Sequence, residues 1–252
     1  NFLRFLCEKL ELTKVQVFIT SSPLTMSYAF GLEDKISGSV KSELVYPPFE
    51  PQPSSDIRLN ESIIKQLQKK DLLLSYPYES MDPFLKLLKE ASYDNSVISI
   101  KISIYRLAKN AKIVDYLCAA AENDKDVTVL IELRARFDEQ NNIDWSQRLE
   151  QAGCRIIYGF EGYKVHSKVC LITRRERGKI SYITQIGTGN YNEKTSKQYT
   201  DFSLMTSDME IGTDANEFFK NMAIGNLEGN YSTLLVAPNS MKSEIIKLID
   251  RE

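Results

Sequence analysis

Between residues 97 and 158, apolar β-branched runs alternate with amphipathic ones, and this alternation constrains the fold more than any other feature of the chain. Three runs are predicted strands and the two between them predicted helices: 97–104, 111–123, 127–132, 142–152 and 154–158. Strands and helices joined by short connections favour a parallel sheet covered by helices. The fold class is therefore predicted to be α/β.

The flanking segments modify this picture. Helices are predicted upstream at 60–71 and 82–92, the second with Asp82 as its cap. Downstream, a more hairpin-like pattern predicts three further strands and a helix at 168–174, 180–186, 200–206 and 209–222. The expected architecture is a mixed β-sheet flanked by helices.

A proline-rich stretch at 46–55 marks the predicted domain boundary, since four of the eight prolines lie in residues 47–53. The segment before it is expected to contain a helix near its start, a strand at 15–19 and a helical piece at 24–31. After residue 230, a strand at 233–237 and a helix at 242–249 are predicted to lack packing partners. The chain also opens at Asn1 rather than Met, so it is expected to be a piece of a larger protein.

Composition narrows the possible functions. With 32 Lys and Arg against 34 Asp and Glu, the net charge of −2 argues against a general nucleic-acid partner but allows a local basic site for a polyanion. The single histidine excludes a two-histidine metal site built from this chain alone. Four cysteines without a CxxC pair are predicted to be free thiols, mostly buried, in a reducing compartment. No apolar run approaches the about 18 residues of a membrane span, and neither common glycine-rich phosphate loop is present.

His166 and Lys168 are two residues apart at the start of a predicted strand, so both side chains are expected on one face. A neutral imidazole can attack phosphorus while a nearby ammonium binds the phosphate oxygens. Alternatively, the histidine is an ordinary satisfied side chain in a sheet. Downstream, Gly187 and Gly189 allow close backbone approach to a ligand and Asn190 could orient a phosphate or the histidine, although a plain turn explains the same residues.

Arginines follow two successive strands: Arg106 after the first, then Arg134 and Arg136 after the second. Ligands of open α/β sheets bind beyond the carboxyl ends of the parallel strands, so these guanidiniums could clamp phosphate oxygens. The competing interpretation pairs them with nearby acidic residues, among them Glu132. Three separate segments that bring phosphate-binding groups to one edge favour a phosphate site.

The His166–Lys168 pair followed by Gly187–Asn190 resembles one half-site of the phospholipase D-like superfamily. The acidic residue of its phosphodiesterase members is missing, since Leu-Ile-Thr-Arg fills residues 171–174. Longer strings resemble the polyphosphate kinase family of that fold: YPYESMDP at 76–83, IYR at 104–106, ELRARFDE at 132–139, IGTGNYN at 186–192 and YTD at 199–201. The resemblance covers residues 57–252 and, more weakly, the segment before them.

This resemblance implies a division into residues 1–55 (end of a head domain and linker), 56–230 (first C-terminal, phospholipase D-like half-domain) and 231–252 (start of a second). It also implies reversible transfer of the ATP γ-phosphate to inorganic polyphosphate with Mg²⁺ as cofactor. The expected partners are ATP or ADP, polyphosphate, the remaining domains and a second copy of the full-length protein, in the cytoplasm or at a membrane.

The resemblance also assigns roles to residues. His166 falls on the phosphorylated histidine, Arg106 and Arg136 on arginines beside Mg²⁺-bound phosphates, and Tyr199 on a tyrosine that contacts the nucleotide. Lys168 is expected to be catalytic together with His166, and three further positions are expected to support the site: Asn190, Asp201 and Arg134. A phospholipase D-like phosphodiesterase and a non-catalytic polyphosphate- or nucleotide-binding module are the alternative functions. The group that orients the second ring nitrogen of His166 is not identified.

Overall fold

A computed structural model describes residues 2–47, 49–105, 107, 111–132, 139–160 and 162–252 of the chain. The chain divides into two compact units, Asn1–Phe49 and Glu50–Glu252. The second unit contains the β-sheet and all the predicted site residues.

The first unit is helical where it is regular. It contains α1 (Phe2–Lys9) and α2 (Gly38–Leu44), neither of which has a buried residue. The strand predicted at 15–19 is wrong, because a 3₁₀ helix occupies Lys14–Gln16 and residues 17–20 have no regular structure. A strand needs neighbouring strands for its backbone hydrogen bonds, and three of the apolar residues that suggested one, Val15, Phe18 and Ile19, are more than four-fifths exposed. The helical piece predicted at 24–31 is a 3₁₀ helix at Ser27–Gly31.

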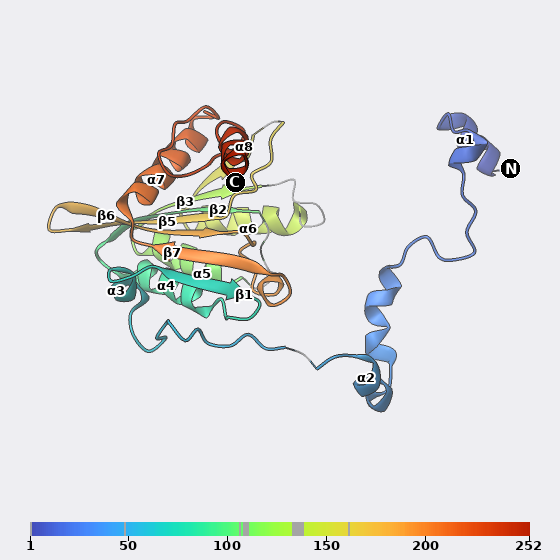
Figure 1. Ribbon diagram of the computed structural model, residues 1–252, viewed down its shortest axis with the longest axis horizontal. Helices are drawn as coiled ribbons and strands as arrows, with labels where there is room; N and C mark the ends of the chain where they lie inside the picture. The colour runs from blue at the N-terminus through green and yellow to red at the C-terminus, as the bar shows by residue number, and fades with distance from the viewer. Residues whose placement is uncertain (1, 48, 106, 108–110, 133–138, 161) are drawn as a thin grey trace. The chain divides into compact units, whose positions relative to one another are not determined.

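The second unit is built on one seven-stranded mixed sheet (Figure 1), which confirms the predicted fold class. Its strands are β1 (Leu72–Tyr76), β2 (Val97–Ile104), β3 (Asp126–Ile131), β4 (Arg155–Tyr158), β5 (Val169–Glu176), β6 (Lys179–Gly187) and β7 (Asp201–Thr206). Their order across the sheet is β1-β7-β6-β5-β2-β3-β4. Only β2, β3 and β4 are mutually parallel, whereas the other neighbours pair antiparallel.

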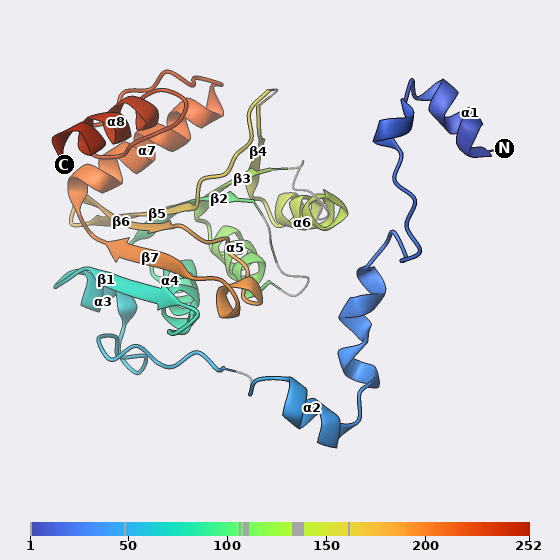
Figure 2. The ribbon, with the colours of Figure 1, turned by 45° about the vertical axis from the view of Figure 1, so that its right-hand side comes forward.

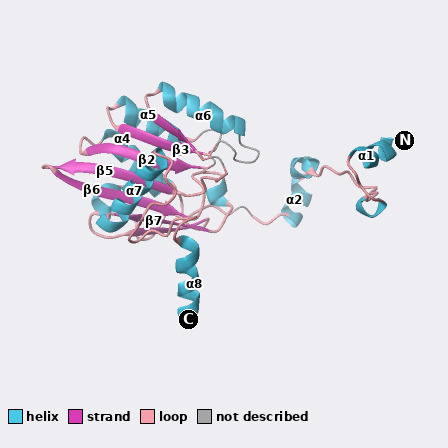
Figure 3. Cartoon of the chain, turned by 90° about the horizontal axis from the view of Figure 1, so that it is seen from above, coloured by secondary structure: helices cyan, strands magenta, loops and turns pink. Residues whose placement is uncertain are grey.

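Helices cover both faces of this sheet (Figures 2 and 3). They are α3 (Ile63–Leu67), α4 (Asp82–Tyr93), α5 (Lys112–Glu122), α6 (Glu139–Gln151) and α7 (Met209–Ala223), whereas α8 (Met241–Arg251) has no buried residue. The larger core packs α4 and α5 on one face through Phe84, Leu88 and Leu117, and a smaller core under α7 is centred on Phe219. Among the described helices, none is both long enough and apolar enough to cross a membrane. Three of the four predicted free thiols are buried: Cys118, Cys154 and Cys170.

Three predictions about these elements need correction. The helix expected at 60–71 spans only Ile63–Leu67, because the chain turns at residues 68–70 before it enters β1 at Leu72. The N-cap of α4 is Met81 rather than Asp82. No strand forms at 233–237, because the amides of that segment bond to side chains instead of a neighbouring strand.

Asp214 of α7 supplies the main side-chain acceptor for that segment. Its buried carboxylate accepts hydrogen bonds from the backbone N–H groups of Ser232 at 3.1 Å, Thr233 at 2.6 Å and Leu234 at 2.9 Å. Burial alone would raise the pKa of Asp214, but the hydrogen bonds from these three amides outweigh it and lower the pKa. The ionised carboxylate therefore ties the segment that follows residue 230 to α7.

We expect Asp214→Asn to lower the free energy of unfolding at pH 7 by about 2–3 kcal/mol, the scale of hydrogen bonds to a buried charged group. Because the folded-state pKa lies below the unfolded one, this contribution is present above about pH 4 and is lost as the pH falls through the folded-state pKa. Urea unfolding of both proteins at pH 7 and pH 3 measures it. Glu217→Gln, on the exposed side of the same helix, is the matched control. An Asp214 effect of equal size at both pH values would contradict this explanation.

Candidate active site

Strand ends that are distant in the sequence lie side by side at one end of the strands of the sheet. Because β5 runs antiparallel to both β2 and β6, its first residues lie beside the last residues of those two strands. The backbone N–H of Gly187 donates to the carbonyl of Lys168 at 2.9 Å, which joins the segment before β5 to the segment after β6. The histidine–lysine pair and the glycine loop are therefore neighbours, as the sequence predicts.

His166 and Lys168 meet at the ring of Tyr105, the residue that follows β2. The His166 and Tyr105 rings are edge-to-face, with centroids 4.8 Å apart and planes at 76°. The Nζ of Lys168 lies over the same ring, 5.5 Å from its centroid, and donates a hydrogen bond to the carbonyl of His166. The predicted placement of both side chains on one face is consistent with this arrangement.

The two side chains differ in burial. His166 is exposed, whereas Lys168 retains only 5% of its accessible surface. Burial lowers the pKa of Lys168 to about 8, and the charge of Asp201 opposes this shift without cancelling it. The site therefore contains a solvent-accessible imidazole next to an amine that changes charge close to neutral pH.

Ser103, inside β2, fixes the backbone around this pair. Its hydroxyl donates to the carbonyl of Ser167 at 2.9 Å and accepts the backbone N–H of Val169 at 3.1 Å. Ser103 is completely buried, so these bonds are shielded from water. They hold the segment that carries His166 and Lys168 against the end of β2.

Two further buried polar residues anchor the same edge. Glu132, which follows β3, accepts the backbone N–H of Val165 at 2.8 Å through its carboxylate. The amide nitrogen of Asn142 in α6 donates to the carbonyls of Tyr105 at 2.9 Å and Glu132 at 2.8 Å. Sequence reasoning missed Tyr105, Ser103 and Asn142 as parts of the site. The one available signal was a polar residue within an apolar strand, which applies to Ser103.

The glycine loop is shaped by Asp201, the first residue of β7. Thr188 donates its hydroxyl to Oδ1 of Asp201 at 2.8 Å. A Cβ on Gly189 would lie 2.4 Å from Oδ2 of Asp201, so only glycine fits there. Gly189 thus lets this carboxylate approach the loop closely, and the approach of a ligand stays a prediction. Oδ1 of Asn190 is buried without a hydrogen-bond partner among the described residues, which leaves an acceptor in the loop.

The remaining predicted residues have different outcomes. Tyr199, two residues before β7, has a side chain that is 62% exposed and therefore accessible to a ligand. Arg106, Arg134 and Arg136 lie outside the described residues. The predicted arginine clamp thus stays a prediction.

Mg²⁺ was predicted beside Arg106 and Arg136. Within the described ranges, no group of three His, Cys, Asp or Glu side chains could hold a metal ion. Mg²⁺ usually keeps several waters and is bound through one or two carboxylates together with substrate phosphates. The described residues thus hold no ready-made protein cage for Mg²⁺, and an ion carried by the phosphates stays a prediction.

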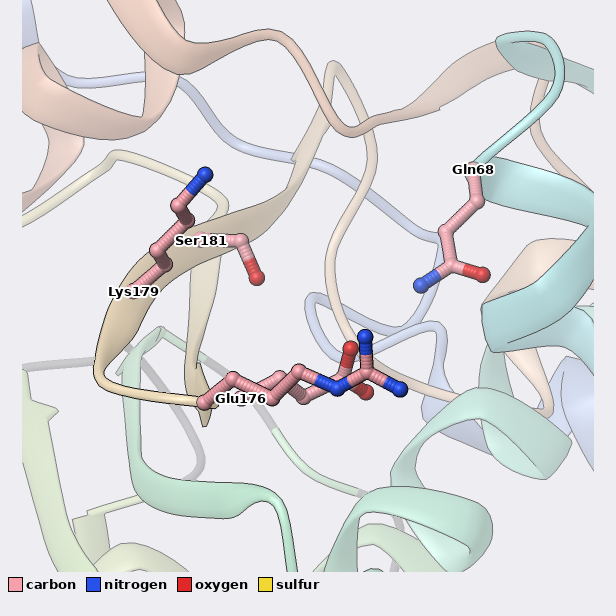
Figure 4. A pocket seen from close by; sticks show the side chains of 5 residues that line it. Gln68, Glu176, Lys179 and Ser181 are labelled. Atoms are coloured by element: carbon pink, nitrogen blue, oxygen red, sulfur yellow. The ribbon is translucent and has the colours of Figure 1, made fainter.

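A hollow lies at the opposite edge of the sheet (Figure 4). It is lined at the β5–β6 hairpin and the end of α3 by Gln68, Glu176, Arg177, Lys179 and Ser181. Since β5 runs from Val169 to Glu176, the hollow lies about 25 Å along the strand from Lys168. It is separate from the candidate site.

Fold and sequence together place the chain among the C-terminal domains of polyphosphate kinases. The family model described as "Polyphosphate kinase C-terminal domain 1" matches residues 62–227. The chain therefore belongs to the polyphosphate kinase family.

Individual relatives agree with this assignment. Over 99% of its length the chain is 40% identical to the polyphosphate kinase of Bacillus cereus, and over its full length 38% identical to that of Pseudomonas aeruginosa. It spans 36% of each of these relatives. The crystal structure of polyphosphate kinase from Porphyromonas gingivalis matches 86% of the chain with a TM-score of 0.71 and 35% identity, and the match spans 38% of that structure. The chain thus corresponds to about a third of these relatives.

Proposed function

We propose that the chain carries part of an active site that transfers the γ-phosphate of ATP reversibly to inorganic polyphosphate through a phosphohistidine. Membership of the polyphosphate kinase family supports the reaction type. The observation that carries the proposal is the exposed imidazole of His166 beside the buried amine of Lys168, both in contact with one aromatic ring.

In this mechanism, a neutral ring nitrogen of His166 attacks the γ-phosphorus with its lone pair. The bond between that phosphorus and the bridging oxygen breaks, and ADP leaves with the electron pair. The terminal oxygen of polyphosphate then attacks the same phosphorus, the phosphorus–nitrogen bond breaks, and the imidazole regains its lone pair. Phosphoryl transfer of this kind depends mainly on in-line positioning and on cations around the equatorial oxygens.

Charges beside His166 would stabilise the transferring group. The ammonium of Lys168 is one such cation, and Arg106 and Arg136 are proposed to hold phosphate oxygens. Tyr199 is proposed to contact the nucleotide. Asn190, Asp201 and Arg134 would support the site. Mg²⁺ is proposed only as the ion that accompanies the phosphates of ATP.

The proposal also includes the surroundings of the site. Residues 1–55 would be the end of a head domain and its linker, 56–230 a first C-terminal, phospholipase D-like domain, and 231–252 the start of a second. The additional length of the relatives supports the expectation that further domains complete the catalyst. Buried free thiols favour a reducing compartment such as the cytoplasm, and the full-length protein is proposed to be a homo-oligomer.

Incubation with γ-³²P-ATP tests the proposal. Two samples are compared: the 252-residue chain, and a chimera in which it replaces the matching segment of the Bacillus cereus enzyme. We expect the chimera to acquire an acid-labile, base-stable protein label that polyphosphate removes, and the chain alone to make little or no polyphosphate. Binding of ATP without a label in either sample would favour a binding module. Cleavage of a phosphodiester substrate would favour a phosphodiesterase. Either result would refute the kinase proposal.

A further inference from the structure

We propose that Tyr105 is a positioning residue whose ring fixes the His166 imidazole and the Lys168 ammonium relative to each other. This inference rests on the proposed function, because the placement of His166 matters for catalysis only if His166 is the nucleophile. Tyr105 is half-buried immediately after β2, at the edge where the candidate site lies.

Both ring contacts have favourable geometry. A centroid separation of 4.8 Å and an interplanar angle of 76° fall within the range of edge-to-face aromatic pairs. The Lys168 nitrogen, 5.5 Å from the ring centroid, lies within the distance over which a cation is attracted to an aromatic face. One ring therefore contacts the proposed nucleophile and the proposed phosphate-binding cation at the same time.

The backbone around the ring is firmly held. Asn142, which is 1% exposed, donates to the carbonyl of Tyr105 at 2.9 Å. Two residues earlier, Ser103 bonds to the backbone on both sides of Lys168. Buried hydrogen bonds thus join the segment that carries Tyr105 to the segment that carries His166 and Lys168. The Tyr105 ring therefore has a fixed position relative to both side chains.

The fixed position of the Tyr105 ring has two consequences for the reaction. Burial disfavours the ammonium form of Lys168, and the negative face of the aromatic ring partly compensates for the lost water. The edge-to-face contact limits rotation of the exposed His166 ring, which must direct a nitrogen at phosphorus. A phenylalanine at position 105 would keep both contacts, whereas a leucine would remove both.

The single histidine of the chain makes a direct test possible, because every imidazole signal belongs to His166. The ¹⁵N-labelled 252-residue chain and its Tyr105→Phe and Tyr105→Leu variants are compared by ¹H–¹⁵N spectra of the imidazole. Competitive acetylation with peptide mass spectrometry gives the Lys168 titration. We expect Tyr105→Phe to match the unmodified chain. Tyr105→Leu should change the tautomer ratio of His166 and lower the pKa of Lys168 by about half a pH unit.

These measurements need no ATP, so their outcome does not depend on whether the proposed phosphoryl transfer occurs. Unchanged His166 and Lys168 signals in Tyr105→Leu would overturn the inference, as would a Tyr105→Phe variant that behaves like Tyr105→Leu. If Tyr105→Leu does not fold, Tyr105→Met replaces it as the ring-free variant.

In the labelling-competent chimera, Tyr105→Leu should slow phosphorylation of His166 by about tenfold or more, since a misplacement of about 1 Å can cost 100-fold. Tyr105→Phe should stay within twofold, and equal rates for both variants would also overturn the inference.

Discussion

Replacing His166 by alanine is expected to abolish the acid-labile label from γ-³²P-ATP, with a loss of at least about 1,000-fold in the rate of labelling. The reason is chemical, since His166 is the proposed nucleophile and the only histidine that this chain contributes to the chimera. His166 is exposed, so its removal leaves no cavity in the core and the fold should persist. The rate is measured in the chimera with the Bacillus cereus enzyme, together with the thermal unfolding temperature.

The control for this experiment is Lys179→Ala, which removes an exposed charge at the opposite edge of the sheet. It should leave labelling unchanged within a factor of two. A His166→Ala chimera that still acquires the label at the original rate would show that another residue is phosphorylated. A control variant with the same loss would show that the assay reports general damage to the protein.

Lys168→Met is expected to reduce the rate of labelling by about 100- to 1,000-fold, the scale on which removal of one transition-state contact acts. Because the pKa of Lys168 is lowered to about 8, its ammonium form is lost as the pH rises through 8. Labelling in the unmodified chimera should therefore decline between pH 7 and 9.5. Lys168→Arg retains a charge at all these pH values, so this decline should disappear in that variant even if its absolute rate is lower.

Lys101→Met provides a matched comparison, because burial also lowers the pKa of Lys101, a half-buried lysine of β2. Its amine donates to Asn216 of α7 at 3.0 Å rather than contacting the site. Its replacement should change labelling less than twofold. A Lys168→Arg variant that shows the same decline above pH 8 as the unmodified protein would assign the titration to a different group.

The elements that sequence reasoning predicted well are those whose own pattern decides their structure. The strand at 97–104 and the helices at 82–92 and 111–123 correspond to β2, α4 and α5 within one or two residues. Their periodicity reflects a face buried in the main core. β1 was missed because it is five residues long and its partner β7 lies about 130 residues further along the chain. No local signal reports such a pairing.

Two strands were predicted that do not form, which is the opposite of missing β1. β-branched residues predicted strands at 15–19 and 233–237, but backbone pairing depends on a neighbour that local sequence does not reveal. In the second case, the amide of Leu234 bonds to Asp214 and that of Val236 to Ser240. Prediction of the site residues was limited in the same way, because local sequence does not reveal their neighbours. His166 and Lys168 were recognisable from their spacing, whereas Asn142 acts through bonds to backbone carbonyls, which any residue can offer.

The position of β5 between β2 and β6 has a consequence for how the site comes into existence during folding. Ser103 and the residues that it binds are separated by 64 and 66 positions in the chain. Contacts of this separation form only after a large loop has closed, at an entropic cost that local structure cannot offset. The histidine and lysine therefore acquire their geometry only once the central strands have paired, and an incompletely folded chain should be chemically inert.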